Sequence, residues 1–407
     1  MNQISKAAPE AVGLSTSRLG RISHWMQQLV AQAKLAGLIT TIARRGQIVH
    51  LETCGKMDLA ADKPMTPDTI FRIYSMTKPL TSTAIMMLYE EGRFQLDDPI
   101  SRYLPMFKKL RVFAGGSVED YETVPAAREI TFKDLLTHTS GFTYGFMEAT
   151  PVDALYRAHK VDFQTEEATL PEMMERLARL PLLCQPGAEW NYSVSTDVLG
   201  ALVETISGMP FDRFLDERII QPLGMRDTGF YVPESNHHRF AANYGKGKDG
   251  KIALIDDPRK SRYLRPRMLN SGGGGLVSTA HDYMRFCQML ARKGELDGVR
   301  LLGRKTVEFM TRNHLRGDLA DMGQPRFSES SYAGIGFGLG FSVMLDPAKA
   351  EIIGSPGEHA WGGAASTAFW IDPAEEMVVI LLTQFMPSST YPIRRELRVL
   401  TYQAIVD

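Results

Sequence analysis

The sequence predicts an α+β protein in which one antiparallel sheet, flanked by helices, is built from both ends of the chain and interrupted by a large helical region. Three observations predict this class: a helix and hairpin pattern near the start, strand patterns and a helix near the end, and helical patterns between them. We expect residues 1–74 and 335–407 to form the sheet region and residues 75–334 the mainly helical region. Ser75 would then lie at the seam.

The N-terminal segment has the pattern of a helix followed by a β-hairpin. Between Ser15 and Ala33 the apolar residues recur at helical spacing and form one stripe. Two short apolar segments follow at residues 38–43 and 47–52, and the turn residues 44–46 (Arg-Arg-Gly) join them. The pattern therefore predicts helix, strand, turn and strand before the first loop.

The stretch from Ser75 to Gly92 predicts the helix around which the rest of the chain is arranged. Apolar residues recur at helical spacing from Leu80 onward, and Gly92 stands where a left-handed C-cap is favoured. Pro79 is compatible with this helix because amide groups of a first turn lack an intrahelical acceptor. Ser75 and Lys78 therefore fall three residues apart on one helix face.

The middle of the chain carries further helix signals and a glycine run. Thr131 and Asp134 resemble a capping box, and Thr279 caps another helix. Residues 235–267 are polar and charged and predict a long surface excursion. The glycines 272–275 can form a flexible linker or a fixed turn that brings bare backbone close to another group, and the nearby cap favours the turn. Further helices are expected at residues 170–180, 195–207 and 211–220.

The C-terminal part predicts three strands and a closing helix. Strand patterns cover residues 338–344, 365–371 and 377–384, and the turn residues 372–373 (Asp-Pro) make the last two a hairpin. Residues 391–405 have a helical pattern. These strands and the first hairpin are the expected components of the single sheet.

Composition and charge exclude several classes of function. The 407 residues include 46 basic and 47 acidic side chains, so no charge excess indicates a nucleic-acid partner. Cys54, Cys184 and Cys287 lack C-x-x-C spacing and predict buried thiols in a reducing compartment, with neither a disulfide frame nor a metal site. No apolar run has the length of a signal peptide core or a membrane span, which favours a cytoplasmic protein. No cofactor is predicted, and the oligomeric state stays open.

Ser75 and Lys78 carry the first chemical signal. The free N–H groups and the dipole at a helix start favour negative charge near Ser75. An amine within reach can then make the serine a nucleophile. The S-x-x-K spacing also arises by chance, roughly once or twice in a chain of this length. Lys78, however, is the only lysine with a serine three residues before it.

Five stretches of the chain together resemble a known family. They are Ser75–Lys78 (SMTK), Leu135–Gly141 (LLTHTSG), Trp190–Val194 (WNYSV), Gly272–Thr279 (GGGGLVST) and His359–Gly363 (HAWGG). In this order they resemble the serine β-lactamase-like enzymes of the class C and penicillin-binding-protein type. Within that group they are most similar to the family VIII carboxylesterases and the related lovastatin side-chain acyltransferase. The resemblance spans nearly the whole chain and implies a β-lactamase-like fold.

The resemblance also implies roles for individual residues. Ser75 would be the nucleophile, Lys78 and Tyr192 the proton-handling pair, and the N–H groups of Ser75 and Ala364 the oxyanion hole. The Y-x-N of the lactamase branch is absent, since Val194 stands two residues after Tyr192, and W-G-G replaces K-T-G, as in the esterase branch. Tyr144 and Phe146 either line the same pocket or pack in the core. The expected substrate-binding residues are Trp361, Gly362, Gly363, Tyr144, Phe146 and Val194.

The chemistry of the remaining candidates is less specific. No G-x-S-x-G elbow accompanies a Ser-His-Asp order, and an amine next to a phenol can take the serine's proton instead. His138 and His359 are more typical of hydrogen-bonded structural histidines than of bases. Asp97 and Asp98 precede a proline and predict a turn. Residues 237–238, a pair of histidines, lack a third metal ligand at suitable spacing.

Three chemical functions and one binding function are compatible with these residues. The leading hypothesis is a carboxylesterase that hydrolyses short acyl esters through an acyl-serine. The alternatives are an acyltransferase that passes the acyl group to an alcohol, or a weak β-lactamase. A non-catalytic relative is disfavoured by the intact Ser75, Lys78 and Tyr192. The expected partner is a small-molecule ester, with no nucleic acid and no membrane.

Overall fold

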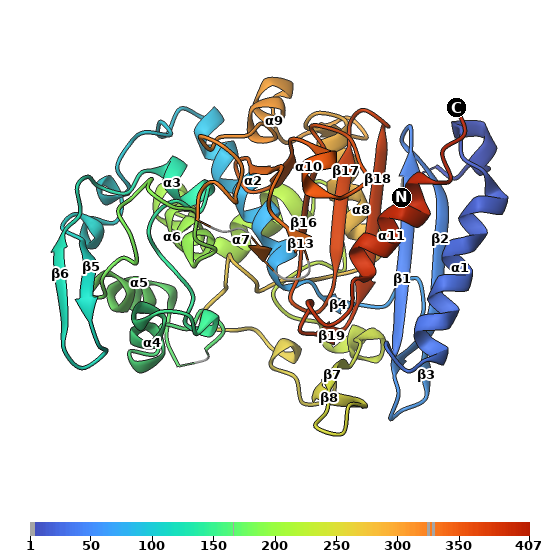
Figure 1. Cartoon of the computed structure of the whole chain (residues 1–407), viewed down its shortest axis with the longest axis horizontal. Coiled ribbons are helices and arrows are strands. Elements are labelled where there is room, and N and C mark those ends of the chain that lie inside the picture. Colours follow the sequence, from blue (N-terminus) through green and yellow to red (C-terminus); the bar gives the residue numbers. More distant parts are fainter. Residues whose placement is uncertain (1–4, 166, 324–325, 328–329) are drawn as a thin grey trace.

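The computed structural model describes residues 5–165, 167–323, 326–327 and 330–407, and both ends of the chain contribute to its central sheet (Figure 1). Within these residues the sheet has eight antiparallel strands. The predicted α+β class is thereby confirmed. The other residues of the two predicted regions, 1–4, 166, 324–325 and 328–329, lie outside the described part. In spatial order the strands are β14 (Ile335–Phe337), β15 (Ser342–Met344), β16 (His359–Gly362), β17 (Ala368–Asp372), β18 (Met377–Thr383), β1 (Gly37–Arg44), β2 (Gln47–Asp58) and β3 (Lys63–Pro64).

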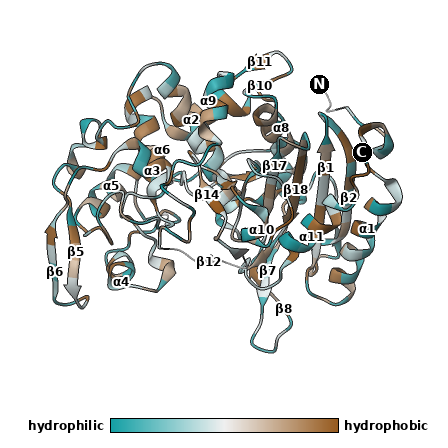
Figure 2. Ribbon diagram, turned by 45° about the horizontal axis from the view of Figure 1, so that its top comes forward, coloured by the Kyte–Doolittle hydropathy of each residue, from teal (hydrophilic) through white to brown (hydrophobic). Residues whose placement is uncertain are grey.

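The pairing of β1 with β18 joins the two ends of the chain at the middle of the sheet. Its register runs from Leu38 opposite Thr383 to Arg44 opposite Met377. Every residue of both strands is buried. Figure 2 shows β18 and its neighbour β17 in the brown of hydrophobic residues. Strands covered by helices on both faces need this continuous apolar character.

Helices form a layer on each face of the sheet. One face carries α1 (Thr16–Ala31) and α11 (Ile393–Tyr402), which lie side by side in Figure 1 and share an apolar cluster that includes Ile22 and Leu397. The other face packs on α2 (Thr77–Glu90) and α8 (Ala280–Ala291), and the same core continues into the helical region. The remaining helices are α3 (Phe132–Leu136), α4 (Pro151–Ala158), α5 (Leu170–Ala178), α6 (Ser195–Ser207), α7 (Phe211–Leu215), α9 (Arg304–Met310) and α10 (Pro347–Ala350).

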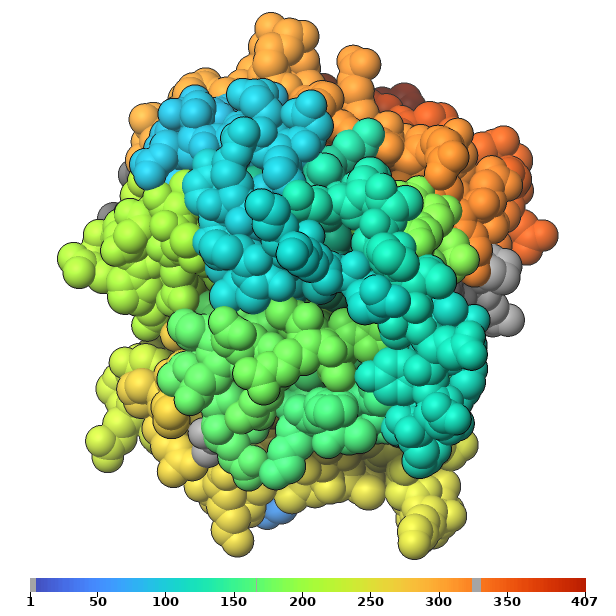
Figure 3. Space-filling model, turned by 90° about the vertical axis from the view of Figure 1, so that its left-hand side faces the viewer, coloured from blue at the N-terminus to red at the C-terminus, as the bar shows by residue number. Residues whose placement is uncertain are grey.

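The helical region makes up one end of the molecule. Figure 3 views this end, whose surface is formed mainly by the segments coloured cyan and green. The capping box at Thr131 and Asp134 is present and starts α3, as predicted. The helix expected at residues 211–220 is divided, because α7 continues as a π-helical turn from Asp216 to Ile220.

Short strand pairs hold the connecting segments in place. They are β4 (Phe71–Arg72) with β9 (Val277–Ser278), β5 (Arg111–Gly116) with β6 (Tyr121–Pro125), β10 (Glu295–Leu296) with β11 (Val299–Arg300), β12 (Arg326–Phe327) with β13 (Ser330–Ser331), and β7 (Asn243–Lys246) between β8 (Ile252–Asp256) and β19 (Phe385–Met386). The β4–β9 pair ends directly before Ser75 and thereby fixes the path of the chain into α2.

The prediction of residues 235–267 as a surface excursion is wrong in part. Tyr263 is fully buried, and β7 pairs with β19 beside the main sheet. The fully buried Arg72 donates to Asp256 at 2.7 Å and lies over the Phe240 ring. A buried guanidinium requires such partners, so the polar residues of this segment compensate a charge in the interior.

The prediction of one strand over residues 338–344 is also wrong in part. Strand β14 ends at Phe337 and β15 begins at Ser342, because Gly340 turns the chain with a φ of 100°. Strand β16 was not found from its pattern, since it has only four residues, of which the last is a glycine that a second glycine follows. The predicted division of the chain at residues 74–75 and 334–335 remains a prediction.

Candidate active site

Ser75 lies in a single 3-10 turn, Tyr74–Met76, that leads into α2. The prediction that the α-helix begins at Ser75 is therefore wrong by two residues, because α2 begins at Thr77. Tyr74 has a φ of 42°, an unusual value for a residue with a side chain. Such backbone strain persists where surrounding structure enforces it, and here the hydrogen bond from Ile73 N–H to the Leu276 carbonyl (3.1 Å) holds the chain before the turn.

The hydroxyl of Ser75 meets the two groups that were expected to handle its proton. Tyr192 Oη lies 2.5 Å from Ser75 Oγ, and Lys78 Nζ lies 3.4 Å from it. Tyr192 comes from the loop before α6, more than a hundred residues after Ser75. The fold therefore brings the serine, the amine and the phenol together, and the phenol is the nearer of the two groups.

Lys78 is buried and held by three further contacts. Its ammonium donates to the Gly273 carbonyl at 2.7 Å and to Tyr144 Oη at 2.9 Å. It also lies 4.5 Å from the centre of the Tyr192 ring. The glycine run at residues 272–275 is thus a fixed turn that presents a carbonyl to Lys78.

Asp197 is the polar group that sequence reasoning missed. Its carboxylate Oδ1 accepts hydrogen bonds from Ser271 Oγ (2.6 Å) and Gly273 N–H (2.9 Å), so it holds the residue whose carbonyl accepts from Lys78. A Cβ on Gly273 would lie 2.4 Å from Asp197 Oδ2, which excludes a side chain there. Burial raises the pKa of Asp197, and the charge of Lys78 opposes the rise. In the sequence, an aspartate in the first turn of a helix is indistinguishable from an ordinary helix-start residue.

Ala364 lies where the end of β16 approaches the 3-10 turn that contains Ser75. Gly363 before it tolerates no side chain, because a Cβ would lie 2.4 Å from the Ile73 carbonyl oxygen. Among the described residues, no carbonyl accepts a hydrogen bond from the N–H of Ser75 or of Ala364. Both residues line the same cavity. Their two N–H groups are therefore available to a substrate oxygen.

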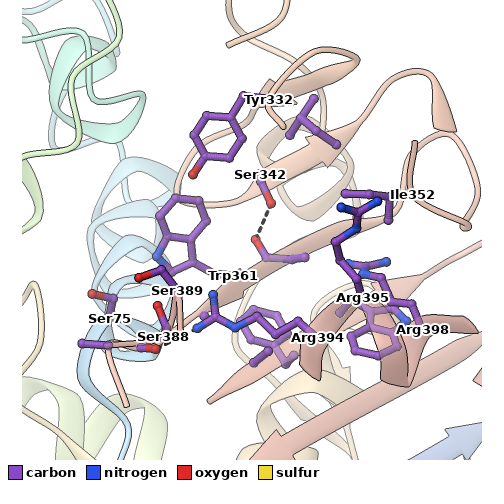
Figure 4. Close-up of a pocket in the computed structure, with 18 of the residues that line it drawn as sticks. Ser75, Tyr332, Ser342, Ile352, Trp361, Ser388, Ser389, Arg394, Arg395 and Arg398 are labelled. Atoms are coloured by element: carbon purple, nitrogen blue, oxygen red, sulfur yellow. Dashed lines mark hydrogen bonds between the residues drawn. The ribbon is translucent and has the colours of Figure 1, made fainter. Parts of the chain in front are cut away.

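A cavity of about 450 Å³ opens at Ser75 (Figure 4). The indole of Trp361 forms one wall next to the serine, with its ring 5.6 Å from that of Tyr192. Tyr144, which was also expected to bind substrate, contacts Lys78 and is not among the residues that line the cavity, whereas Phe146 stacks on it at the exposed rim. The expected residues that line the cavity are Ser75, Phe146, Tyr192, Trp361, Gly362, Gly363 and Ala364.

Val194 does not reach this cavity, which corrects its expected role. It precedes α6 as the N-cap residue and is 1% exposed within the apolar core of the helical region. Two residues after Tyr192 the chain has already turned into the helix. The side chain at that position therefore packs inward.

The two rival histidines have structural surroundings. His138 is buried, with Nδ1 3.1 Å from Ser193 Oγ, and burial together with the charge of Lys78 holds its pKa well below the usual value. Burial lowers the pKa of His359 to about 4. In the described part of the chain, no cluster of three or more histidine, cysteine or carboxylate side chains has an arrangement that could hold a metal ion.

Two further expectations concern the cysteines and the membrane. Cys54, Cys184 and Cys287 are free thiols, the first half-buried and the others buried. Within the described residues, every helix is too short or too polar to cross a lipid bilayer.

Comparison with known proteins agrees with this geometry. The Beta-lactamase family model matches residues 22–403. Esterase EstB of Burkholderia gladioli is 32% identical over 92% of this chain and 93% of its own length. Protein Rv1367c of Mycobacterium tuberculosis is 38% identical over 87% of this chain and 86% of its own.

Solved structures give the same result. The structure described as EstCE1, a hydrolase with promiscuous acyltransferase activity, superposes with a TM-score of 0.80 at 28% identity, covering 95% of this chain and 99% of that one. The antiparallel sheet, the serine and lysine at the start of α2 and the near-complete family match lead to one conclusion: the chain belongs to the Beta-lactamase family.

Proposed function

We propose that this protein is a serine carboxylesterase that hydrolyses short-chain acyl esters through an acyl-serine intermediate. The observation that carries the proposal is the contact of Ser75 Oγ with Tyr192 Oη at 2.5 Å, beside the buried ammonium of Lys78. The relatives named as an esterase and a hydrolase support it. Among these enzymes, the W-G-G sequence favours the family VIII carboxylesterases.

Acylation needs a route for the serine's proton. Ser75 Oγ attacks the ester carbon while its proton passes to the Tyr192 oxygen, the nearer acceptor. The acceptor in this step is the phenolate form of Tyr192, and the positive charge of Lys78 near the Tyr192 ring attracts its negative charge. The same proton then goes to the leaving alkoxide, and an acyl-serine and a free alcohol result.

Deacylation repeats these steps with water. Tyr192 accepts a proton from water as the water oxygen attacks the acyl carbon, and returns it to Ser75 Oγ as the carboxylic acid leaves. In both halves the carbonyl oxygen becomes an anion that the N–H groups of Ser75 and Ala364 would hold. Each lost donor in such a hole costs about 3 to 4 kcal/mol of transition-state stabilisation.

A graded series of p-nitrophenyl esters tests the proposal. Incubation with and without an added alcohol separates hydrolysis from acyl transfer, the second candidate, which the description of EstCE1 favours. Free acid as the sole product supports the esterase. A new ester formed with the alcohol would favour the transferase, and the absence of turnover on every ester would contradict both. We also propose a cytoplasmic location, because the spacing of the three cysteines indicates thiols in a reducing compartment.

We expect simple esters to be better substrates than β-lactams. Trp361 offers an apolar wall with no charge for the lactam carboxylate, and Val194 is buried away from the cavity. A missing charge-assisted contact is worth about 1.5 to 3 kcal/mol, or roughly ten- to a hundredfold. The kcat/KM for p-nitrophenyl butyrate should therefore exceed that for nitrocefin by about two decades. Comparable values would show that a cation of the cavity, such as Arg394, holds the lactam carboxylate.

The buried carboxylate of Asp197 should support activity at a cost in stability. Its pKa is raised, so the folded protein binds a proton more readily than the unfolded chain, and stability falls as the pH rises above the ordinary value for an aspartate. Asp197→Asn should therefore raise Tm at pH 8, with the gain shrinking towards pH 4. It should lower kcat about tenfold or more, because the Gly273 peptide that positions Lys78 loses its charged partner. Unchanged kcat with unchanged Tm would contradict this role.

A further inference from the structure

The cavity at Ser75 extends well beyond the groups needed to cleave an ester. It is lined by residues of β16 and by the residue on either side of that strand, from Gly363 back to Glu358, and by residues of the first two turns of α11. Five residues of extended strand span about 16 Å. Figure 4 shows Ser75 and Trp361 at one side of this space and Arg395, Arg398 and Ile352 at the other, with Arg394 between. The cavity is therefore long enough for a substrate with an extended chain.

The far side of the cavity is positively charged. Three of its lining residues are arginines of α11: Arg394, Arg395 and Arg398. Arg398 is neutralised by the buried Glu358, to which it donates at 2.6 Å. Glu358 is the only acidic side chain among the described residues that line the cavity. One acid against three arginines leaves an excess of positive charge.

Arg395 is the cation in position to meet a ligand. Its guanidinium donates to the backbone carbonyl of Glu351 at 3.1 Å, and in the described part of the chain it takes part in no ion pair. A backbone carbonyl holds the side chain in place without cancelling its charge. The residue is exposed at the cavity rim, so a bound anion can reach it.

Two of these arginines do not stabilise α11 through the helix dipole. Arg394 and Arg395 stand in the first turn of α11, where the positive end of the helix dipole disfavours cations. The walls of the same cavity also include the apolar side chains of Met344, Ile352 and Trp361. Apolar walls that end at a cation match an aliphatic chain that ends in an anion.

We propose that the ester substrate carries a carboxylate on the arm remote from the scissile bond, and that Arg395 binds this carboxylate. A guanidinium pairs with a carboxylate through two parallel hydrogen bonds, which favours this anion. The proposal rests on the proposed esterase function and names its substrate class. Arg395 is then a specificity residue, with no part in bond cleavage.

Kinetics with matched esters test the proposal. Mono-p-nitrophenyl esters of dicarboxylic acids of roughly six to ten carbons, a range that the cavity admits, are compared with p-nitrophenyl esters of monocarboxylic acids of equal length. A second series, acetate esters of ω-hydroxy acids against acetates of simple alcohols, places the carboxylate on the alcohol arm. We expect kcat/KM about tenfold higher for the anionic member in one series, falling as KCl is raised to about 0.5 M. Equal values in both series would overturn the proposal.

Arg395→Gln should remove this preference and leave the rate on the neutral esters within about twofold, since the residue does not touch the reacting groups. Arg395→Lys keeps the charge and should keep part of the preference. Arg18→Gln is the matched control, because Arg18 is also exposed and also donates to a backbone carbonyl, that of Gln403, far from the cavity. A preference that survives Arg395→Gln, or is lost equally in Arg18→Gln, would overturn the assignment.

A binding measurement separates this inference from the esterase function. Calorimetry with the Ser75→Ala protein compares the affinities for two ketones. One is 7-oxooctanoate, in which a ketone replaces the ester, and the other is the neutral 2-octanone. We expect 7-oxooctanoate to bind about tenfold tighter than 2-octanone, and we expect this difference to disappear in Ser75→Ala/Arg395→Gln. That result would support the carboxylate site even if no ester tested is turned over. Equal affinity for both ketones would overturn the site while the esterase function stands on its own kinetics.

Discussion

Ser75→Ala is expected to reduce ester turnover to the uncatalysed background, the largest effect of any single substitution in this chain. The substitution removes the oxygen that forms the acyl bond, and no other described hydroxyl has both Lys78 and Tyr192 within 3.5 Å. The measurement is kcat/KM on p-nitrophenyl butyrate. A p-nitrophenyl phosphonate should label the unmodified protein once, at Ser75, as mass spectrometry of its peptides would show.

Ser389 gives the matched control, because it lines the same cavity and lies near Ser75 in Figure 4. Ser389→Ala should still take up the phosphonate at Ser75. A label found on Ser389, or labelling that persists in Ser75→Ala, would contradict the assignment of the nucleophile.

Lys78→Ala and Tyr192→Phe should each lower kcat by roughly a thousandfold. Tyr192 is the nearest group to the Ser75 proton, and Lys78 supplies the positive charge beside it. Because the two groups serve one proton path, the double variant should be little worse than either single variant. Single-turnover kinetics of acylation would measure each loss directly. Fully additive losses would mean that the two residues act in separate steps.

Tyr144→Phe is the control for this pair. The Tyr144 hydroxyl accepts a hydrogen bond from Lys78 Nζ at 2.9 Å, but no contact joins it to Ser75 in the described structure. Its loss should reduce kcat about tenfold, as expected for a group that positions Lys78 without moving the serine's proton. A loss equal to that of Tyr192→Phe would place Tyr144 on the proton path.

Local sequence patterns predicted much of the fold. Short apolar segments bounded by turn residues predicted the first hairpin and the strand at Met377, and the caps at Thr131 and Thr279 marked helix starts that the structure confirms. The errors lie where long-range packing decides the local structure. The segment around Tyr263 looks like surface loop by composition, yet its polar residues compensate the buried Arg72.

The residues of the candidate site were accessible from sequence for a different reason. Ser75 and Lys78 are close because one turn of chain separates them, so their contact is a local property. Tyr192, Trp361 and Ala364 were found only through the resemblance to a family. Val194 shows the limit of such transfer, since a position next to a motif residue can face the core instead of the substrate.

The sequence by itself determined the chemical groups of this protein: a serine and an amine at the start of a buried helix, an uncharged W-G-G strand end, and the strands that close one sheet from both termini. The serine, the amine and the strands follow from spacing and periodicity, which act over a few residues, whereas the role of W-G-G came from the resemblance to a family. Tertiary structure alone decided that Asp197 holds Lys78 through the Gly273 peptide and that Arg395 lies at the far side of the catalytic cavity. The reason is physical: contacts between residues tens to hundreds of positions apart depend on how the sheet and helices pack, and no local pattern encodes which polar side chain the packing places opposite another.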